Sequence, residues 1–168
     1  IVANPDSAAG INGFTGAAGV VNVLSNDTLN GAPATLATVT IAAVVPATPI
    51  GGGPVPTLNP GTGSVDVPAG TPAGVYTIGY TICEILNPTN CSTTNVTITV
   101  EAAVIDAVDD NLGPVNGASG NPVAGNAFTN DTLNGAAVNP AAITATVQTP
   151  ATPIGGGPVP VLNTATGD

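Results

Sequence analysis

The chain has 168 residues and contains no lysine, arginine or histidine, so its ten carboxylates give a formal charge of −10. A nucleic-acid partner is excluded, because phosphate binding needs the basic side chains that this chain lacks. Base-activated nucleophiles cannot be assembled either, which leaves only paired carboxylates or a metal ion for catalysis. The apolar residues are nearly all Ala, Val, Ile and Leu, interrupted by 22 glycines and 17 prolines. This composition predicts an all-β protein.

About seven short strands are expected in the first hundred residues, which is the number typical of an immunoglobulin-like antiparallel β-sandwich. Pro54 and Pro56 cannot donate to a β-ladder, so we expect their strand at a sheet edge. The glycines at 51–53 indicate a bend, because they lack the Lys and the following helix of a phosphate loop. The expected strands lie at residues 1–3, 19–24, 38–45, 54–58 and 64–67 and in two arms within 74–100.

Residues 74–100 predict a β-hairpin whose register can be tested. Pairing Cys83 with Cys91 places Ile78 opposite Val96 without mixing the two faces, whereas a slip of one residue would expose every apolar side chain. We therefore predict a Cys83–Cys91 disulfide, and with it an oxidising, extracellular location. Two reduced thiols in a cytosolic protein are the alternative. The same register pairs Thr81 with Thr93, Thr77 with Thr97 and Tyr76 with Ile98.

The two tyrosines of this hairpin lie at the same alternate positions as its apolar residues. Tyr76 and Tyr80 alternate with the threonines and share a face with Ile78 and Ile82. This period predicts that both rings are buried in the core. A carbohydrate-stacking pair is the functional alternative.

The sequence repeats with a period of 104 residues. NDTLNGA at 26–32 recurs at 130–136, and PATPIGGGPVP at 46–56 recurs at 150–160. The alignment has no gap, and about half of its positions are identical. It predicts a complete repeat at 1–104 and the N-terminal part of a second repeat at 105–168. For the strands that the second copy lacks, we expect either that the polypeptide continues or that a neighbouring chain donates them.

Several stretches resemble the tandem immunoglobulin-like, cadherin-like repeats of very large bacterial cell-surface adhesins. They are NPD at 4–6, VNVLSNDTLNG at 21–31, the segment from PAGTPAG to NVTITV at 68–100, and IDAVDDN at 105–111. The closest resemblance is to the repeat region of filament adhesins of gliding bacteria. It implies sandwiches repeated along an exported fibre, whose partners are neighbouring repeats of the same or an identical chain. No stretch is apolar enough to span a membrane, so we expect no membrane insertion by this segment.

Four carboxylates gather around the junction between the repeats: Glu101, Asp106, Asp109 and Asp110. In cadherin-like domains such residues bind calcium, and carboxylate oxygens suit Ca²⁺, so the resemblance makes them candidate ligands. A solvated acidic linker is the alternative. The internal comparison favours the linker, because the first repeat has Val2 and Pro5 where the second has Asp106 and Asp109.

The resemblance also implies glycosylation. Ser7, Thr28 and Thr132 each follow an aspartate and precede an apolar residue, as in acceptor sites of bacterial O-glycosylation. Formal N-linked sequons begin at Asn26, Asn90, Asn95 and Asn130. For Asp27-Thr28 and Asp131-Thr132, however, the sequence favours an Asx-type turn in which the aspartate accepts backbone N–H groups.

Taken together, these features favour a non-catalytic structural repeat of an extracellular bacterial filament or giant adhesin. The first alternative is a carbohydrate- or Ca²⁺-dependent adhesion module that holds surface polysaccharide. An enzyme with paired carboxylates, as in glycoside hydrolysis, ranks last, because the acids are scattered over turns and linkers.

Overall fold

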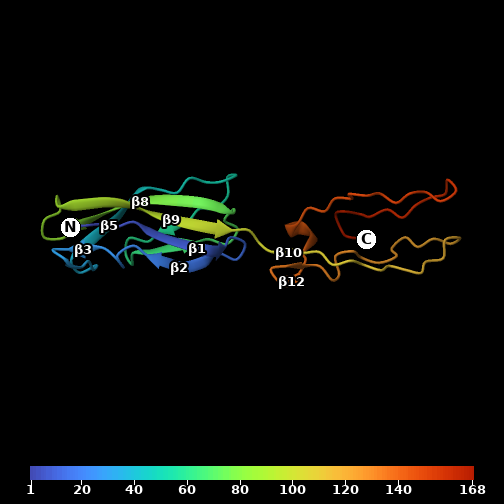
Figure 1. Ribbon diagram of the computed structural model, residues 1–168, viewed down its shortest axis with the longest axis horizontal. Helices are drawn as coiled ribbons and strands as arrows, with labels where there is room; N and C mark the ends of the chain where they lie inside the picture. Colours follow the sequence, from blue (N-terminus) through green and yellow to red (C-terminus); the bar gives the residue numbers. More distant parts are fainter. The chain divides into compact units, whose positions relative to one another are not determined.

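The computed structural model describes all 168 residues as two compact units, Ile1–Ala103 and Val104–Asp168 (Figure 1). Regular structure consists of β-strands and one short 3₁₀ turn at Pro140–Ala142, which confirms the predicted all-β class. No helix has the length and hydrophobicity needed to cross a bilayer.

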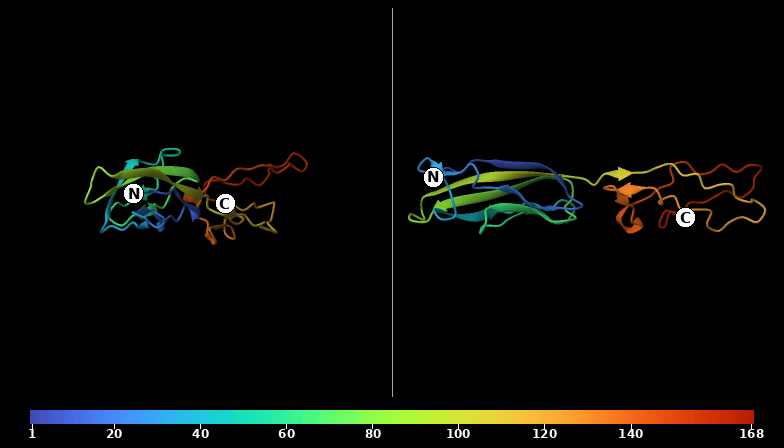
Figure 2. Two further views of the ribbon diagram at one scale, coloured as in Figure 1. Left: turned by 60° about the vertical axis from the view of Figure 1, so that its left-hand side comes forward. Right: turned by 90° about the horizontal axis from the view of Figure 1, so that it is seen from below.

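Unit 1 contains a four-stranded sheet built around a long hairpin. The hairpin runs along the whole unit (Figure 2). It has the predicted register, with Cys83 opposite Cys91 and Ile78 opposite Val96. Strands β8, β9 and β5 are antiparallel, whereas β1 runs parallel to β9. In spatial order the strands are β1 (Asp6–Asn12), β9 (Cys91–Glu101), β8 (Gly74–Glu84) and β5 (Val39–Val45).

A second, three-stranded sheet faces the first. Its order is β2 (Ala17–Asn22), β7 (Ser64–Val67) and β6 (Thr57–Leu58), all antiparallel. A separate small hairpin joins β3 (Thr28–Leu29) to β4 (Ala32–Pro33). Its turn residues Asn30 and Gly31 have φ values of 52° and 78°, as a two-residue hairpin turn requires.

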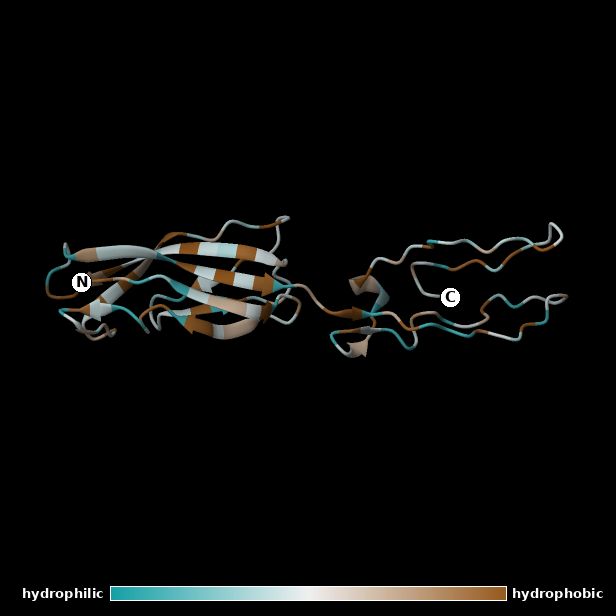
Figure 3. Cartoon of the chain, viewed as in Figure 1, coloured by the Kyte–Doolittle hydropathy of each residue, from teal (hydrophilic) through white to brown (hydrophobic).

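One hydrophobic core lies between the two sheets of unit 1. Apolar and polar residues alternate along its strands (Figure 3), so one face of each strand packs inward. Tyr76 and Tyr80 are 1% and 0% exposed, which confirms their predicted place in the core. The other large core residues are Ile11, Val23, Val39, Ile41, Val65, Val67, Ile78, Ile82, Val96, Ile98 and Val100.

Two of the predicted strands differ from the structure. The strand expected at residues 1–3 is only a bridge between Val2 and Thr28, and the first true strand is β1. Its sequence DSAAGIN has a single β-branched residue, so β1 depends on pairing with β9 rather than on local propensity. The strand expected at 54–58 shortens to β6, because Pro54 and Pro56 have no N–H to donate.

Unit 2 contains a small antiparallel sheet of three two-residue strands. These are β10 (Ile105–Asp106), β11 (Thr132–Leu133) and β12 (Ala136–Ala137). Asn134 in the turn between β11 and β12 has a φ of 52°. Leu133 is buried, whereas Ile105 is 63% exposed.

Candidate functional site

The most unusual chemical feature of unit 1 is a buried cluster of oxygen atoms around the hydroxyl of Tyr80. This hydroxyl lies 2.8 Å from Asp6 Oδ2, and 3.4 and 3.3 Å from the two carboxylate oxygens of Asp27. It also lies 3.0 Å from the carbonyl oxygen of Asn4 and 3.1 Å from that of Val23. Both carboxylates are buried, with Asp6 8% and Asp27 1% exposed. Five acceptor oxygens therefore surround a group that has one hydrogen to donate.

Three parts of the chain bring these groups together. Asp6 begins β1 opposite Val96 of β9, and Tyr80 lies on the inner face of β8. Asp27 Oδ1 accepts the backbone N–H of Asn4 at 2.7 Å. The side-chain amide of Asn4 donates to the backbone carbonyl of Asn26 at 2.7 Å. This bond also connects residues 4–6 to residues 23–27.

Burial sets the electrostatics of the cluster. Burial raises the pKa of Asp6, and the negative charge of Asp27 adds to this rise, while the hydrogen bond from Tyr80 opposes it. The pKa of Asp27 is also raised by burial, against hydrogen bonds from Asn4 and Tyr80. Burial and the two carboxylates raise the pKa of the Tyr80 hydroxyl, so it remains protonated.

The sequence interpretation of Asp27 was partly wrong, and it did not identify the cluster. The aspartate does accept a backbone N–H, but that of Asn4, 23 residues earlier, and not one within its own turn. One signal was available: because the chain has no basic side chain, any carboxylate that folds into the core must be held by neutral donors.

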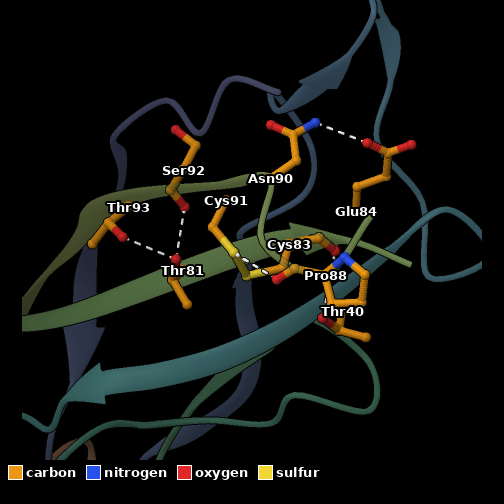
Figure 4. The surroundings of a disulfide bond; sticks show 9 residues. All are labelled: Thr40, Thr81, Cys83, Glu84, Pro88, Asn90, Cys91, Ser92 and Thr93. Carbon is orange, nitrogen blue, oxygen red and sulfur yellow. Dashed lines mark hydrogen bonds between the residues drawn. A yellow bond between two sulfur atoms is a disulfide. The ribbon is translucent and has the colours of Figure 1, made fainter. Parts of the chain in front are cut away.

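The predicted disulfide joins Cys83 and Cys91 at the loop end of the β8–β9 hairpin (Figure 4). Next to it, Thr93 Oγ1 donates to Thr81 Oγ1 at 2.9 Å across the strands. In the loop, the Glu84 carboxylate accepts the side-chain amides of Asn87 and Asn90 at 2.9 and 2.8 Å. These two hydrogen bonds lower the pKa of Glu84, and the bond from Asn90 has the larger effect. The disulfide and the loop hydrogen bonds together fix this end of the hairpin.

The four predicted calcium ligands are divided between the two units. Glu101 ends β9 of unit 1, and Asp106 lies in β10 of unit 2; both are exposed. Asp109 and Asp110 follow β10 and are also exposed. No group of three or more His, Cys, Asp or Glu side chains is placed to hold a metal ion. Calcium binding at these four residues stays a prediction.

The candidate glycosylation residues differ in accessibility. Ser7 is exposed on β1. Thr28 and Thr132 are half-buried in β3 and β11, and the backbone of Thr28 exchanges two hydrogen bonds with Val2. Ser7 is therefore the most open of the three to a modifying enzyme.

Carboxylate catalysis requires paired acids beside a cleft. The acids of the Tyr80 cluster are enclosed in the core, and two open hollows lie in unit 2. One is formed by residues 111–116 with 120, 121 and 124, and the other by residues 139–141, 143–145 and 164–166. Neither is lined by an acidic side chain.

No protein-family model matches the chain, and no curated protein is significantly similar to it in sequence.

Proposed function

We propose that the chain is a non-catalytic structural repeat of an extracellular bacterial surface filament or giant adhesin. In this proposal, immunoglobulin-like sandwiches with a period of 104 residues follow one another along a stalk or fibre. The partners of each sandwich are neighbouring repeats of the same or an identical chain.

The observation that carries the proposal is a set of hydrogen bonds that recurs 104 residues later. The bond from Asn4 N–H to Asp27 Oδ1 (2.7 Å) has its counterpart from Val108 N–H to Asp131 Oδ1 (2.8 Å). The β3–β4 hairpin has its counterpart in β11–β12, with the same φ at the first turn residue. Three further pairs are Val23–Gly63 with Ala127–Gly167, Asn59–Gly63 with Asn163–Gly167, and Asn22–Thr62 with Asn126–Thr166.

The strand order of unit 1 supports the immunoglobulin-like assignment. The strand orders β9-β8-β5 and β2-β7-β6 match the GFC and BED strands of such a seven-stranded sandwich, whereas the first strand, β1, pairs with β9 and not with β2. Near the start of β8, the Tyr76 hydroxyl donates to the carbonyl of Pro72 at 2.8 Å. A tyrosine that bonds back to the backbone a few residues upstream is a hallmark of immunoglobulin-like domains.

Three observations support a stalk role outside the cell. The Cys83–Cys91 disulfide is of a kind that persists in oxidising compartments. The absence of basic side chains removes the usual nucleophile-base pairs. Tyr76 and Tyr80 are buried, so they offer no ring to a sugar, which weakens the alternative of a carbohydrate-binding module.

Labelling of intact source cells tests the proposal. Antibodies raised against unit 1 should decorate filaments on unpermeabilised cells in electron micrographs, and external protease should remove the label. Label that appears only after permeabilisation would contradict the proposal. A glycan array probed with the purified chain addresses the alternative, which saturable binding to one glycan class would favour.

A further inference from the structure

We propose that Asp6, Asp27 and Tyr80 form a buried proton-binding site that ties the first six residues of unit 1 to its core. The site holds one proton shared between the two carboxyl groups. When the site loses this proton, residues 1–6 are released from the core.

The shortage of hydrogen-bond donors in the cluster favours this proton, because the only other donor to the two carboxylates is the Asn4 N–H, which bonds Asp27 Oδ1. The Tyr80 hydroxyl donates one hydrogen, although the carboxylates of Asp6 and Asp27 and two carbonyl oxygens all lie within 3.4 Å of it. If both carboxyls were ionised, two negative charges would face each other and the two carbonyl dipoles in a buried site. A proton on either carboxyl removes one charge and supplies a second O–H donor.

No other group of unit 1 can neutralise the pair. Strands β2 and β5 carry no titratable side chain. The chain has no lysine, arginine or histidine to supply a cation. The remaining groups are neutral or acidic and have partners of their own: Asp66 accepts Gly19 N–H, Tyr76 donates to Pro72, Glu84 accepts Asn87 and Asn90, and Cys83 is bonded to Cys91. Glu101 lies at the far end of β9 from Cys91.

The sign of the pH dependence follows from the raised pKa of both acids. Above the ordinary aspartate pKa of about 4, the unfolded chain has released its protons, whereas the folded site still holds one. The stabilisation by this proton is therefore complete below pH about 4 and is lost as the pH rises through the folded-state pKa. A salt-bridged aspartate would give the opposite trend.

Besides the Tyr80 cluster, several exposed or partly exposed hydrogen bonds connect residues 1–6 to the rest of unit 1. Residues 1–6 also contact the rest of unit 1 through the Val2–Thr28 bridge and a bond from Ala3 N–H to Ser92 Oγ at 3.0 Å. The side-chain amide of Asn4 donates to the Asn26 carbonyl, and that of Asn26 donates to the Pro5 carbonyl. All of these contacts are exposed or partly exposed, so the Tyr80 cluster is the buried anchor of this segment. Loss of the proton should therefore increase amide exchange at residues 2–6 before unit 1 unfolds as a whole.

Carboxyl ¹³C NMR of the full chain tests the site directly. One of Asp6 and Asp27 should titrate above the ordinary aspartate pKa of about 4. Titration of both carboxyl groups at the ordinary value would overturn the proposal, and this result needs no variant to fold.

Unfolding in urea between pH 5 and 8 gives the second readout. For the wild-type chain, the unfolding constant of unit 1 should rise by up to tenfold per pH unit between the unfolded-state pKa of about 4 and the folded-state pKa, and should level off above the folded-state pKa. Asp6→Asn and Asp27→Asn should each reduce this slope, whereas Asp66→Asn should keep it. Equal slopes in all four proteins would contradict the proposal. So would stabilisation by CaCl₂ at pH 7 that disappears in Asp6→Asn, because the site would then bind a cation in place of a proton.

Discussion

Reduction of the Cys83–Cys91 bond should destabilise unit 1 without opening its native hairpin. The bond spans a sequence separation of 8 and limits the freedom of the unfolded chain. For a loop of this size, the chain-entropy relation gives a loss of about 2.5 kcal/mol on reduction. The native loop keeps its own hydrogen bonds, from Glu84 N–H to the Asn90 carbonyl (3.0 Å) and from Asn87 to the Glu84 carboxylate (2.9 Å). Most of the loss should therefore arise in the unfolded state.

Tyrosine emission measures this loss for unit 1 alone, because Tyr76 and Tyr80 are the only tyrosines and the chain has no tryptophan. Urea titrations of the oxidised chain, the reduced chain and the Cys83→Ser/Cys91→Ser double variant should give one transition each. The reduced chain and the variant should lie together, about 2–3 kcal/mol below the oxidised chain. Reductant should have no effect on the variant. A loss below about 0.5 kcal/mol would refute the reasoning, because the disulfide would then add no measurable constraint to the unfolded chain.

Two further substitutions test the packing of unit 1 in the same titration. At Gly16, with a φ of 65°, an added Cβ would lie 2.5 Å from the Val67 carbonyl oxygen and 2.6 Å from Ala69 N, whereas Gly19, with a φ of 61°, has open space. Gly16→Ala should therefore lower the free energy of unfolding by about 1–3 kcal/mol more than Gly19→Ala does. Equal losses would mean that the backbone at residues 67–69 can move away from the added methyl group. Tyr76→Phe should lose about 1 kcal/mol with the bond to Pro72, and a neutral result would show that water replaces it.

The hairpin could be predicted in detail because three independent signals agree on it. Period-two alternation fixes which faces are buried, the Asn- and Pro-containing loop places the turn, and the pairing of Cys83 with Cys91 sets the register. Each signal is local in sequence, so none depends on knowing the fold. The buried positions of Tyr76 and Tyr80 follow from the same alternation.

Strand β1 and the Tyr80 cluster could not be predicted in this way. β1 is rich in Ala and Gly, and its partner is β9, which lies far along the chain. The cluster joins Asn4, Asp6, Val23, Asp27 and Tyr80, whose proximity exists only after both sheets have formed. Asp27 stands in a repeated NDTLNGA segment that reads as a turn, and its acceptor role becomes visible only when Asn4 is placed beside it.

The most direct test of the central claim extends the chain by a second copy of residues 65–103, placed after Asp168. Since Asp168 aligns with Ser64, this addition supplies residues equivalent to strands β7 to β9 of unit 1. Pulled as a single molecule, the extended chain should show two unfolding events with equal contour-length gains. Each gain should lie below the roughly 340–370 Å that 103 extended residues span at about 3.3–3.6 Å per residue, because the length of the folded unit and of the disulfide-closed loop is subtracted. One event, with residues 105–168 and the added segment extending without resistance, would contradict the account of a tandem structural repeat.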